Sequence, residues 1–400
     1  MAGALRNVVV VGGSYVGMAT AKELASILPV THRVLLVEPH SHFHHLFAFP
    51  RFAILPSHEH KAFIPYTSLF PPSSPHKVIR ARAVSLQPNF LTLDRPWLDS
   101  SSSSPSTSLP FDYLIAATGT TLTFPGTMTT DDKPTSISTL RSYQSALKFS
   151  PSVLIIGGGA VGVQMACDLK EIYPEKRVTL VHSRDQLMPV YHPALSDLIK
   201  DRFQELGVNP VTGSRVILPS GGKFPTTYSA EEGQEVHLEN GQTLKAGFVI
   251  QATGQKPNNR FVKAGMGEGV LNPKNGFVRV KKTMQFFEAK YNHLFAVGDI
   301  NDCGAHKAAR PGAAQAGVAA RNVVRMIEGE RELEELSVQP AGIHMTLGLK
   351  RHVLFRNPNT ANGDTEPFVQ MKNDGTEDMD IESVWVRRGV VVTDPQDYHL

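Results

Sequence analysis

Two glycine-rich turns are the segments of this sequence whose residue types and spacing could do chemistry. Residues 12–17 read GGSYVG and residues 157–162 read GGGAVG; both fit G-x-G-x-x-G, except that Ser14 takes the middle position of the first. Gly12 permits a tight turn, Gly17 lets a helix pack closely on a strand, and the small Ser14 leaves room for a pyrophosphate. The following helix N-terminus favours such an anion. Both turns predict dinucleotide sites, although an ordinary strand-to-helix turn would explain the first one alone equally well.

The residue that follows the second strand differs between the two turns. Glu38 lies 26 residues after Gly12, where a carboxylate can bind ribose hydroxyls. His182 takes the corresponding place after the second turn, where NAD-selective sites usually carry an acid. Arg184 follows closely and is a candidate partner for a 2′-phosphate, with a solvated surface charge as the alternative. We therefore predict that NADPH is accepted at least as well as NADH.

The two turns lie in a duplicated pattern that organises the chain. Apolar runs at 8–11 and 153–156 precede them, a helical stretch follows each, and further strands are predicted at 34–37 and 178–181. Parallel strands joined by helices indicate an α/β architecture. Two dinucleotide sites in one chain are typical of proteins that pass electrons between two cofactors.

Three later segments add to this pattern. Residues 111–119 and 247–254 are both strands that end in Ala-Thr-Gly, and residues 293–300 are a strand that ends in Gly-Asp. Asp299 is placed to hold the ribityl hydroxyls of a flavin. The candidate cofactor-binding residues are therefore Gly12, Gly13, Ser14, Gly17, Glu38, Thr118, Gly119, Asp299, Gly157, Gly159, Gly162, His182, Arg184, Thr253 and Gly254.

A helix rich in alanine and glycine is predicted over 308–327. Its small residues allow close approach to a flat ring. Its first N–H groups, near Ala313 and Gln315, would stabilise negative charge on a reduced flavin. These two residues are flavin-proximal candidates.

The two cysteines argue against thiol–disulfide chemistry. Such a mechanism needs two thiols at close spacing, one to attack and one to resolve the mixed disulfide. Cys167 is predicted to be a core residue of a helix, and Cys303 has no partner near it in sequence. Cys303 as a lone redox thiol stays open.

Composition narrows the class of protein without naming a partner. Of 400 residues, 41% are apolar and 19% charged, which is typical of a globular chain. A net charge of +3 does not single out nucleic acid, so no nucleic-acid partner is expected. Residue 2 is alanine rather than the glycine needed for myristoylation. We expect a cytoplasmic protein, with peripheral membrane contact and a mitochondrial location left open, as a monomer or homodimer.

The order of these motifs, from residue 7 to about 327, resembles the flavoproteins with two dinucleotide-binding domains in the pyridine nucleotide-disulfide oxidoreductase superfamily. The segments FHHLFAFPR, VTLVHSR and LFAVGDI resemble the apoptosis-inducing-factor-like branch, which includes the ferroptosis suppressor and its fungal relatives. The resemblance implies FAD and NADPH or NADH as cofactors, and often a quinone as acceptor. It also implies that Arg51 and the backbone of Ala83 lie at the FAD.

Several histidines follow Glu38, and His44 and His45 are the flavin-proximal candidates among them. A satisfied packing histidine is an equal alternative for either. No cysteine or carboxylate completes a tetrahedral spacing, so no metal site is predicted. Further along, Trp385 lies in an alternating pattern that predicts a strand.

The expected architecture is α/β, with two Rossmann-like domains and a small C-terminal α+β unit. The FAD domain spans 1–124 and 255–335, the NAD(P)H domain is inserted at 125–254, and the C-terminal unit spans 336–400. The predicted activity is hydride transfer from nicotinamide to flavin N5 and onward transfer of electrons to a quinone-like or other small acceptor. The alternatives are a specialised flavin dehydrogenase or oxidase of secondary metabolism, and a redox-gated binding protein.

Overall fold

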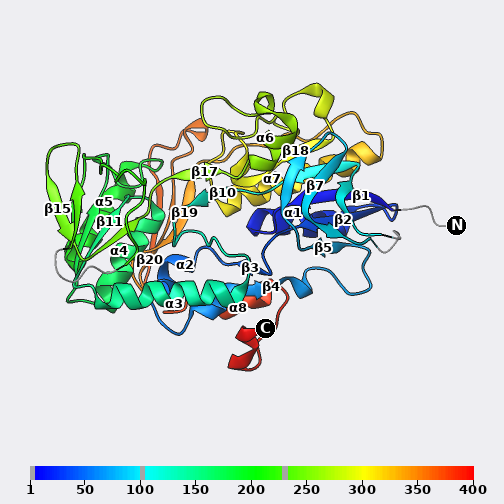
Figure 1. Ribbon diagram of the computed structural model, residues 1–400. Helices are drawn as coiled ribbons and strands as arrows, with labels where there is room; N and C mark the ends of the chain where they lie inside the picture. Colours follow the sequence, from blue (N-terminus) through cyan, green and yellow to red (C-terminus); the bar gives the residue numbers. More distant parts are fainter. Residues whose placement is uncertain (1–4, 100–103, 228–232) are drawn as a thin grey trace. The chain divides into compact units, whose positions relative to one another are not determined.

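The computed structural model describes residues 5–99, 104–227 and 233–400. The chain forms two compact units, each built from three separate stretches. Unit 1 comprises residues 1–43, 65–121 and 256–339, and unit 2 comprises residues 44–64, 122–255 and 340–400. Figure 1 shows the elements along the chain from blue to red.

Unit 1 is built on a five-stranded sheet in the order β18-β9-β1-β2-β5, and every neighbouring pair is parallel. Its strands are β1 (Arg6–Val11), β2 (His32–Val37), β5 (Lys77–Ile79), β9 (Tyr113–Ala116) and β18 (Leu294–Ala296). The register aligns Val8 with Val34 and with Tyr113. Residues 8–11 are four buried valines, as expected of a central strand covered on both faces.

Helices and a second sheet complete unit 1. Helices α1 (Tyr15–Ile27) and α7 (Ala309–Ile327) pack against each other, and α6 (Arg260–Met266) packs on β6. An antiparallel sheet has the order β6-β7-β8. Its strands are β6 (Ala83–Leu86), β7 (Phe90–Trp97) and β8 (Ser106–Pro110).

Unit 2 contains a parallel sheet in the order β13-β12-β11-β16. Its strands are β11 (Ser152–Ile156), β12 (Arg177–Val181), β13 (Val208–Val211) and β16 (Phe248–Gln251). Helices α3 (Lys133–Phe149), α4 (Ala160–Ile172) and α5 (Pro193–Leu206) and the hairpin β14 (Gln234–His237) to β15 (Thr243–Ala246) belong to the same unit. Helix α4 packs on β11, β12 and α5, as expected of a strand–helix–strand repeat.

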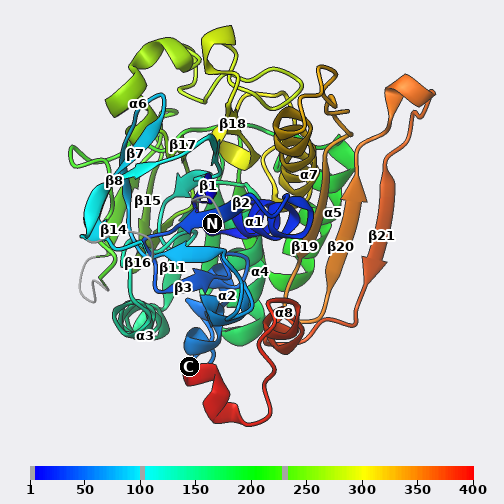
Figure 2. The same ribbon diagram turned by 90° about the vertical axis from the view of Figure 1, so that its right-hand side faces the viewer.

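The C-terminal part of unit 2 is an antiparallel sheet of β19 (Gly342–Thr346), β20 (His352–Arg356) and β21 (Phe368–Lys372). Figure 2 shows β21 at its edge. The short helices α2 (Phe49–Phe52) and α8 (Ile381–Arg387) also belong to this unit. The strand predicted around Trp385 is wrong, because this residue lies in α8. Its ring is fully buried, and its Nε1 donates to the Lys61 carbonyl at 2.8 Å.

Four short strands lie where the chain passes from one unit to the other: β3 (His42–His44), β4 (Phe63–Pro65), β10 (Thr120–Leu122) and β17 (Gln255–Pro257). The predicted α/β class with parallel sheets is confirmed. The compact units divide at 121/122, 255/256 and 339/340, and the domain limits stay a prediction. Residues 44–64 and 340–400, however, pack with 122–255 in one unit. No helix in the described ranges is long and apolar enough to span a membrane.

Candidate functional site

The first glycine turn, in unit 1, is closed so tightly that it requires glycine at two positions. Gly12 has φ of +101°, and a Cβ there would lie 2.7 Å from the Ala117 carbonyl oxygen. A Cβ on Gly17 would lie 1.7 Å from the Gly12 carbonyl oxygen. The turn therefore holds the N-terminus of α1 directly at the end of β1, as phosphate binding requires. We call this turn, residues 12–17, together with Glu38, the first cradle, and the corresponding turn, residues 157–162, together with His182, the second cradle.

The carboxylate of Glu38 closes this first cradle. It is buried, with 5% of the residue exposed, and its Oε2 accepts a hydrogen bond from the Gly13 backbone N–H at 2.5 Å. Its Oε1 accepts from the backbone N–H of His40 at 2.9 Å and from the ring Nδ1–H of the same residue at 2.5 Å. Two carboxylate oxygens offer about four acceptor sites, so capacity remains for a ribose hydroxyl.

Two further features of the first cradle fit a bound pyrophosphate. Ser14 is the N-cap of α1, yet its side chain makes no cap hydrogen bond, and the first turn contains no acidic residue. The positive end of the helix dipole is therefore not offset by a carboxylate of that turn. Tyr66 donates its phenol to the Gly13 carbonyl at 2.8 Å and so braces the turn. No sequence motif pointed to Tyr66.

The second glycine turn, in unit 2, repeats this geometry. Gly157 has φ of +119°, and a Cβ there would lie 2.3 Å from the Ala252 carbonyl oxygen. A Cβ on Gly162 would lie 1.9 Å from the Gly157 carbonyl oxygen. At the middle position, a Cβ on Gly159 would meet no described atom within 4 Å, so space exists for an approaching phosphate. Helix α4 also begins without a side-chain cap or an acidic residue in its first turn.

His182 takes the place in the second cradle that Glu38 takes in the first. The backbone N–H of Gly158 donates to its Nδ1 at 3.1 Å, so the neutral ring carries its proton on Nε2. Among the described residues, this buried Nε2 has no hydrogen-bond partner. Burial lowers the pKa of His182, Arg184 lowers it further, and the backbone of Gln186 opposes the shift only in part. The imidazole of His182 is therefore neutral, and its Nε2–H is a donor without a partner among the described residues.

The predicted Ala-Thr-Gly ends lie beside the two turns within their own units. Thr118 Oγ1 donates to the Asn258 carbonyl at 2.9 Å, and the Asn258 backbone N–H donates to the Gly119 carbonyl at 3.0 Å. In unit 2, the Thr253 carbonyl accepts from Thr123 Oγ1 at 3.1 Å. These contacts give the strand ends a structural role, and their contact with a cofactor stays a prediction.

Asp299 lies directly after β18, in the turn Gly298–Ile300. Burial raises the pKa of its carboxyl, while Lys307 and the Thr120 hydroxyl lower it. Gln315 of α7 is buried, and its Oε1 accepts from the Gly298 backbone N–H at 2.7 Å, so it holds the turn. Ala313 is exposed and lines a groove of about 640 Å³ between α1 and α7.

The structure places three of the candidates for the flavin site, His44, His45 and Ala83, in contacts with other parts of the protein. His44 contacts the rings of Phe49 and Phe63 at centroid distances of 5.6 and 5.1 Å. Burial, with Arg388 and Arg387, lowers the pKa of His45 to about 3. Both histidines fit the packing alternative stated above. Ala83 lies in β6 paired with Leu93, and its approach to FAD stays a prediction.

Arg51 does not fit the role of FAD ligand implied by the resemblance. It is fully buried in unit 2 and forms a bidentate ion pair with Asp168, at 3.0 and 2.9 Å. Its remaining donors bond to carbonyls of Gly348, Leu349, Thr376 and Glu377. Because its nitrogens are already engaged, we leave it out of the cofactor site.

Neither cysteine has a partner for disulfide exchange in the described structure, and both are free. Cys167 is fully buried in α4, and burial raises its thiol pKa well above the usual range. Cys303 is half-buried in unit 1, and burial raises its pKa too. In the described ranges, no group of three or more His, Cys, Asp or Glu is arranged to hold a metal ion.

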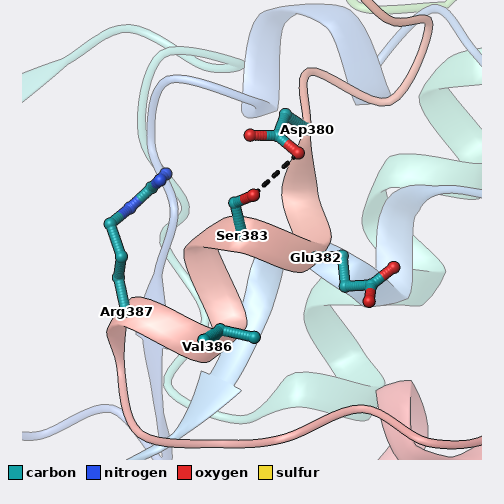
Figure 3. A pocket seen from close by; sticks show the side chains of 5 residues that line it. All are labelled: Asp380, Glu382, Ser383, Val386 and Arg387. Carbon is teal, nitrogen blue, oxygen red and sulfur yellow. Dashed lines mark hydrogen bonds between the residues drawn. The ribbon is translucent and has the colours of Figure 1, made fainter.

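A separate pocket of about 470 Å³ lies on helix α8. Figure 3 shows its lining: Asp380, Glu382, Ser383, Val386 and Arg387. The Ser383 hydroxyl donates to the Asp380 carboxylate at 2.8 Å. No cradle residue lines this pocket, so it is not part of either dinucleotide site.

Comparison with known proteins agrees with the two cradles. The family described as pyridine nucleotide-disulphide oxidoreductase matches residues 6–322. The chain belongs to this family. Family membership makes it an oxidoreductase whose cofactors are FAD and a pyridine nucleotide, as predicted.

Named relatives cover nearly the whole chain. Fe-regulated protein 8 of Mycosarcoma maydis is 31% identical over 407 residues, which is 97% of this chain and 96% of that protein. Ferroptosis suppressor protein 1 of Mus musculus is 27% identical over 355 residues, 86% of this chain and 87% of that protein. The sulfide:quinone oxidoreductase of Aquifex aeolicus shares the fold, with a TM-score of 0.71 at 21% identity over 92% of this chain and 87% of that one. The predicted resemblance is confirmed.

Proposed function

We propose that this protein takes electrons from NADPH, and less readily from NADH, and passes them through FAD to a quinone-like small acceptor. The observation that carries the proposal is the matched pair of cradles, with a carboxylate at the key position of one and a neutral histidine at that of the other. A carboxylate suits ribose hydroxyls but repels a phosphate, whereas an N–H donor suits a 2′-phosphate oxygen.

The residues of unit 1 would hold FAD. Ser14 caps the N-terminus of α1 with a hydroxyl that makes no cap hydrogen bond and would bind the pyrophosphate there, and Glu38, which accepts from the Gly13 N–H, would also accept from the ribose. Asp299 would accept from the ribityl chain. FAD, when bound, takes a hydride from C4 of the reduced nicotinamide and returns two electrons, which with two protons convert a quinone to a quinol.

The residues of unit 2 would hold the nicotinamide nucleotide. Gly159 faces open space for its pyrophosphate, and the buried Nε2–H of His182 would donate to its 2′-phosphate. Arg184 is exposed and would add an attractive charge for the same group. Resemblance to the ferroptosis suppressor branch supports a quinone as acceptor, and the cysteines, one of them fully buried, support transfer without a disulfide.

Stopped-flow mixing under anaerobic conditions tests the proposal. We expect NADPH to bleach the flavin absorption band, NADH to bleach it more slowly, and a soluble short-chain quinone to restore it. Failure of both nucleotides to bleach the band would refute the reductive half of the proposal. Bleaching without reoxidation by the quinone would refute the proposed acceptor.

A further inference from the structure

A lysine side chain is fixed in the segment that follows Asp299 in unit 1. Lys307 precedes helix α7, and its Nζ donates to the carbonyl of Asn301. The same ammonium lies 4.2 Å from the ring centroid of Phe277, within the range of a cation–π interaction. These two contacts fix the charge in place instead of leaving it to move in solvent.

The segment that carries both Asp299 and Lys307 is pinned by buried amides. Asn301 is fully buried, and its Nδ2 donates to the Ala296 carbonyl at 3.0 Å and to Gln315 Oε1 at 2.7 Å. Its own Oδ1 accepts from the Cys303 backbone N–H at 3.0 Å. The spacing between the carboxylate and the ammonium is therefore set by the fold.

The charges on this segment act on each other. The charge of Lys307 lowers the pKa of Asp299. Burial lowers the pKa of Lys307 itself, while the nearby Asp299, Cys303 and Asp302 raise it. Asp302 is itself held by Asn272 Nδ2, at 2.9 Å. Lys307 also lowers the pKa of the Cys303 thiol, which burial raises. The thiol can therefore report the presence of the Lys307 charge.

We propose that Lys307 is a positioning residue that acts through Asp299 to set how readily the flavin is reduced. It offsets the charge of Asp299, so that this carboxylate accepts a hydrogen bond without opposing the negative charge that reduction brings to the site. A cation in a partly buried place stabilises such added charge more than it would in water. The inference rests on the proposed function, because Asp299 is placed at the flavin there.

The test compares the midpoint potential of bound FAD in three variants at pH 8. Lys307→Met removes the charge and Lys307→Arg keeps it. Lys290→Met is the matched control, because Lys290 also lies over a ring in unit 1, that of Tyr291 at 4.8 Å. We expect Lys307→Met to lower the equilibrium constant for reduction about tenfold, which is ~30 mV for two electrons. Lys307→Arg and Lys290→Met should stay near wild type.

A second readout needs no flavin. Iodoacetamide should alkylate Cys303 of the FAD-free wild-type protein at pH 8, since Cys167 is fully buried. Lys307→Met should slow this reaction about two- to fivefold, and Lys307→Arg should not, because the thiolate loses a neighbouring cation.

The outcomes separate the inference from the proposed function. An unchanged potential in Lys307→Met overturns the inference, whether or not alkylation slows. Equal potential shifts in Lys307→Met and Lys307→Arg also overturn it, because they would reflect shape rather than charge. If Lys307→Met loses FAD, Lys307→Gln takes its place under the same criteria. A wild type that binds no FAD, or is not reduced by either nucleotide, refutes the proposed function instead.

Discussion

The two cradles have similar backbones, and the side chain that follows the second strand differs between them in chemical character. A Cβ on Gly13 would lie 2.9 Å from Glu38 Cγ, and a Cβ on Gly158 would lie 2.9 Å from His182 Cγ. In both, a backbone N–H of the turn donates to the side chain that follows the second strand. In unit 1 that side chain is a carboxylate, which only accepts when ionised. In unit 2 it is a neutral imidazole with a donor to spare. On the proposed function, one backbone geometry serves two nucleotides, and this side chain decides which of them binds.

The turn glycines should give the largest effects. Gly17→Ala and Gly162→Ala each place a methyl within 2 Å of a carbonyl oxygen of the same turn, so the cradle must open. We expect Gly17→Ala to purify without FAD, and Gly162→Ala to keep FAD but resist reduction by NADPH. Absorbance spectra with and without NADPH measure both results.

Matched controls for the glycine variants are Gly269→Ala in unit 1 and Gly221→Ala in unit 2, where a Cβ would meet no described atom within 4 Å. Thermal melting checks that all four variants fold. Full flavin in Gly17→Ala, or normal bleaching in Gly162→Ala, would show that the turns are not the cofactor cradles.

Glu38→Ala should weaken FAD binding about 100-fold. The change removes an acceptor for a ribose hydroxyl and leaves the N–H groups of Gly13 and His40 without their partner, and such charge-assisted bonds contribute ~1.5–3 kcal/mol each. Titration of the FAD-free protein by flavin fluorescence gives the affinity. Glu23→Ala, at a partly exposed position of α1, is the control. An affinity within threefold of wild type would contradict the assignment.

His182→Glu should make the second cradle resemble the first. A carboxylate repels a 2′-phosphate and accepts from a ribose hydroxyl, so the ratio of kcat/KM for NADPH to that for NADH should fall at least tenfold. Steady-state kinetics with both nucleotides measure the ratio. His237→Glu, at an exposed position of β14, should leave it unchanged. An unaltered ratio in His182→Glu would contradict the role of His182.

Arg184→Ala should have a smaller effect because the side chain is exposed. We expect KM for NADPH to rise about two- to fivefold, since exposed charge pairs contribute ~0.2–1 kcal/mol. KM for NADH should not change. High salt should shrink the difference between variant and wild type, because it screens exposed charges. An equal rise for both nucleotides would mean that Arg184 does not contact a 2′-phosphate.

The smallest of the expected effects is the contribution of His182 to the pH dependence of the free energy of unfolding. Its pKa is lower in the folded protein than the unfolded value of 6.5. Unfolding therefore takes up a proton below pH 6.5, so its stability contribution is full above that pH and falls as pH drops through the folded pKa. The difference in urea midpoint between wild type and His182→Gln should be constant above pH 7 and should shift against wild type below pH 6. A pH-independent difference would contradict the neutral ring.

The sequence was informative wherever a local pattern carries the structure. The duplicated strand–turn–helix, Glu38 and His182 could all be predicted, because glycine spacing and strand ends fix their places along the chain. Arg51 and Asp168 are 117 residues apart and form a buried ion pair. No local sequence pattern can predict such a pair. Tyr66 reaches the first turn from 53 residues away for the same reason. Trp385 was misplaced because a helix of seven residues is too short to show its period against an alternating background.

We propose that the cradle with the carboxylate, in unit 1, binds FAD and that the cradle with the histidine, in unit 2, binds NADPH. The most direct measurement is the absorbance spectrum of the purified protein, recorded without oxygen before and after one equivalent of NADPH. We expect a flavin band from about one FAD per chain, and we expect NADPH to bleach it. A protein that stays colourless after incubation with FAD, or a flavin band that NADPH leaves unchanged, would contradict it.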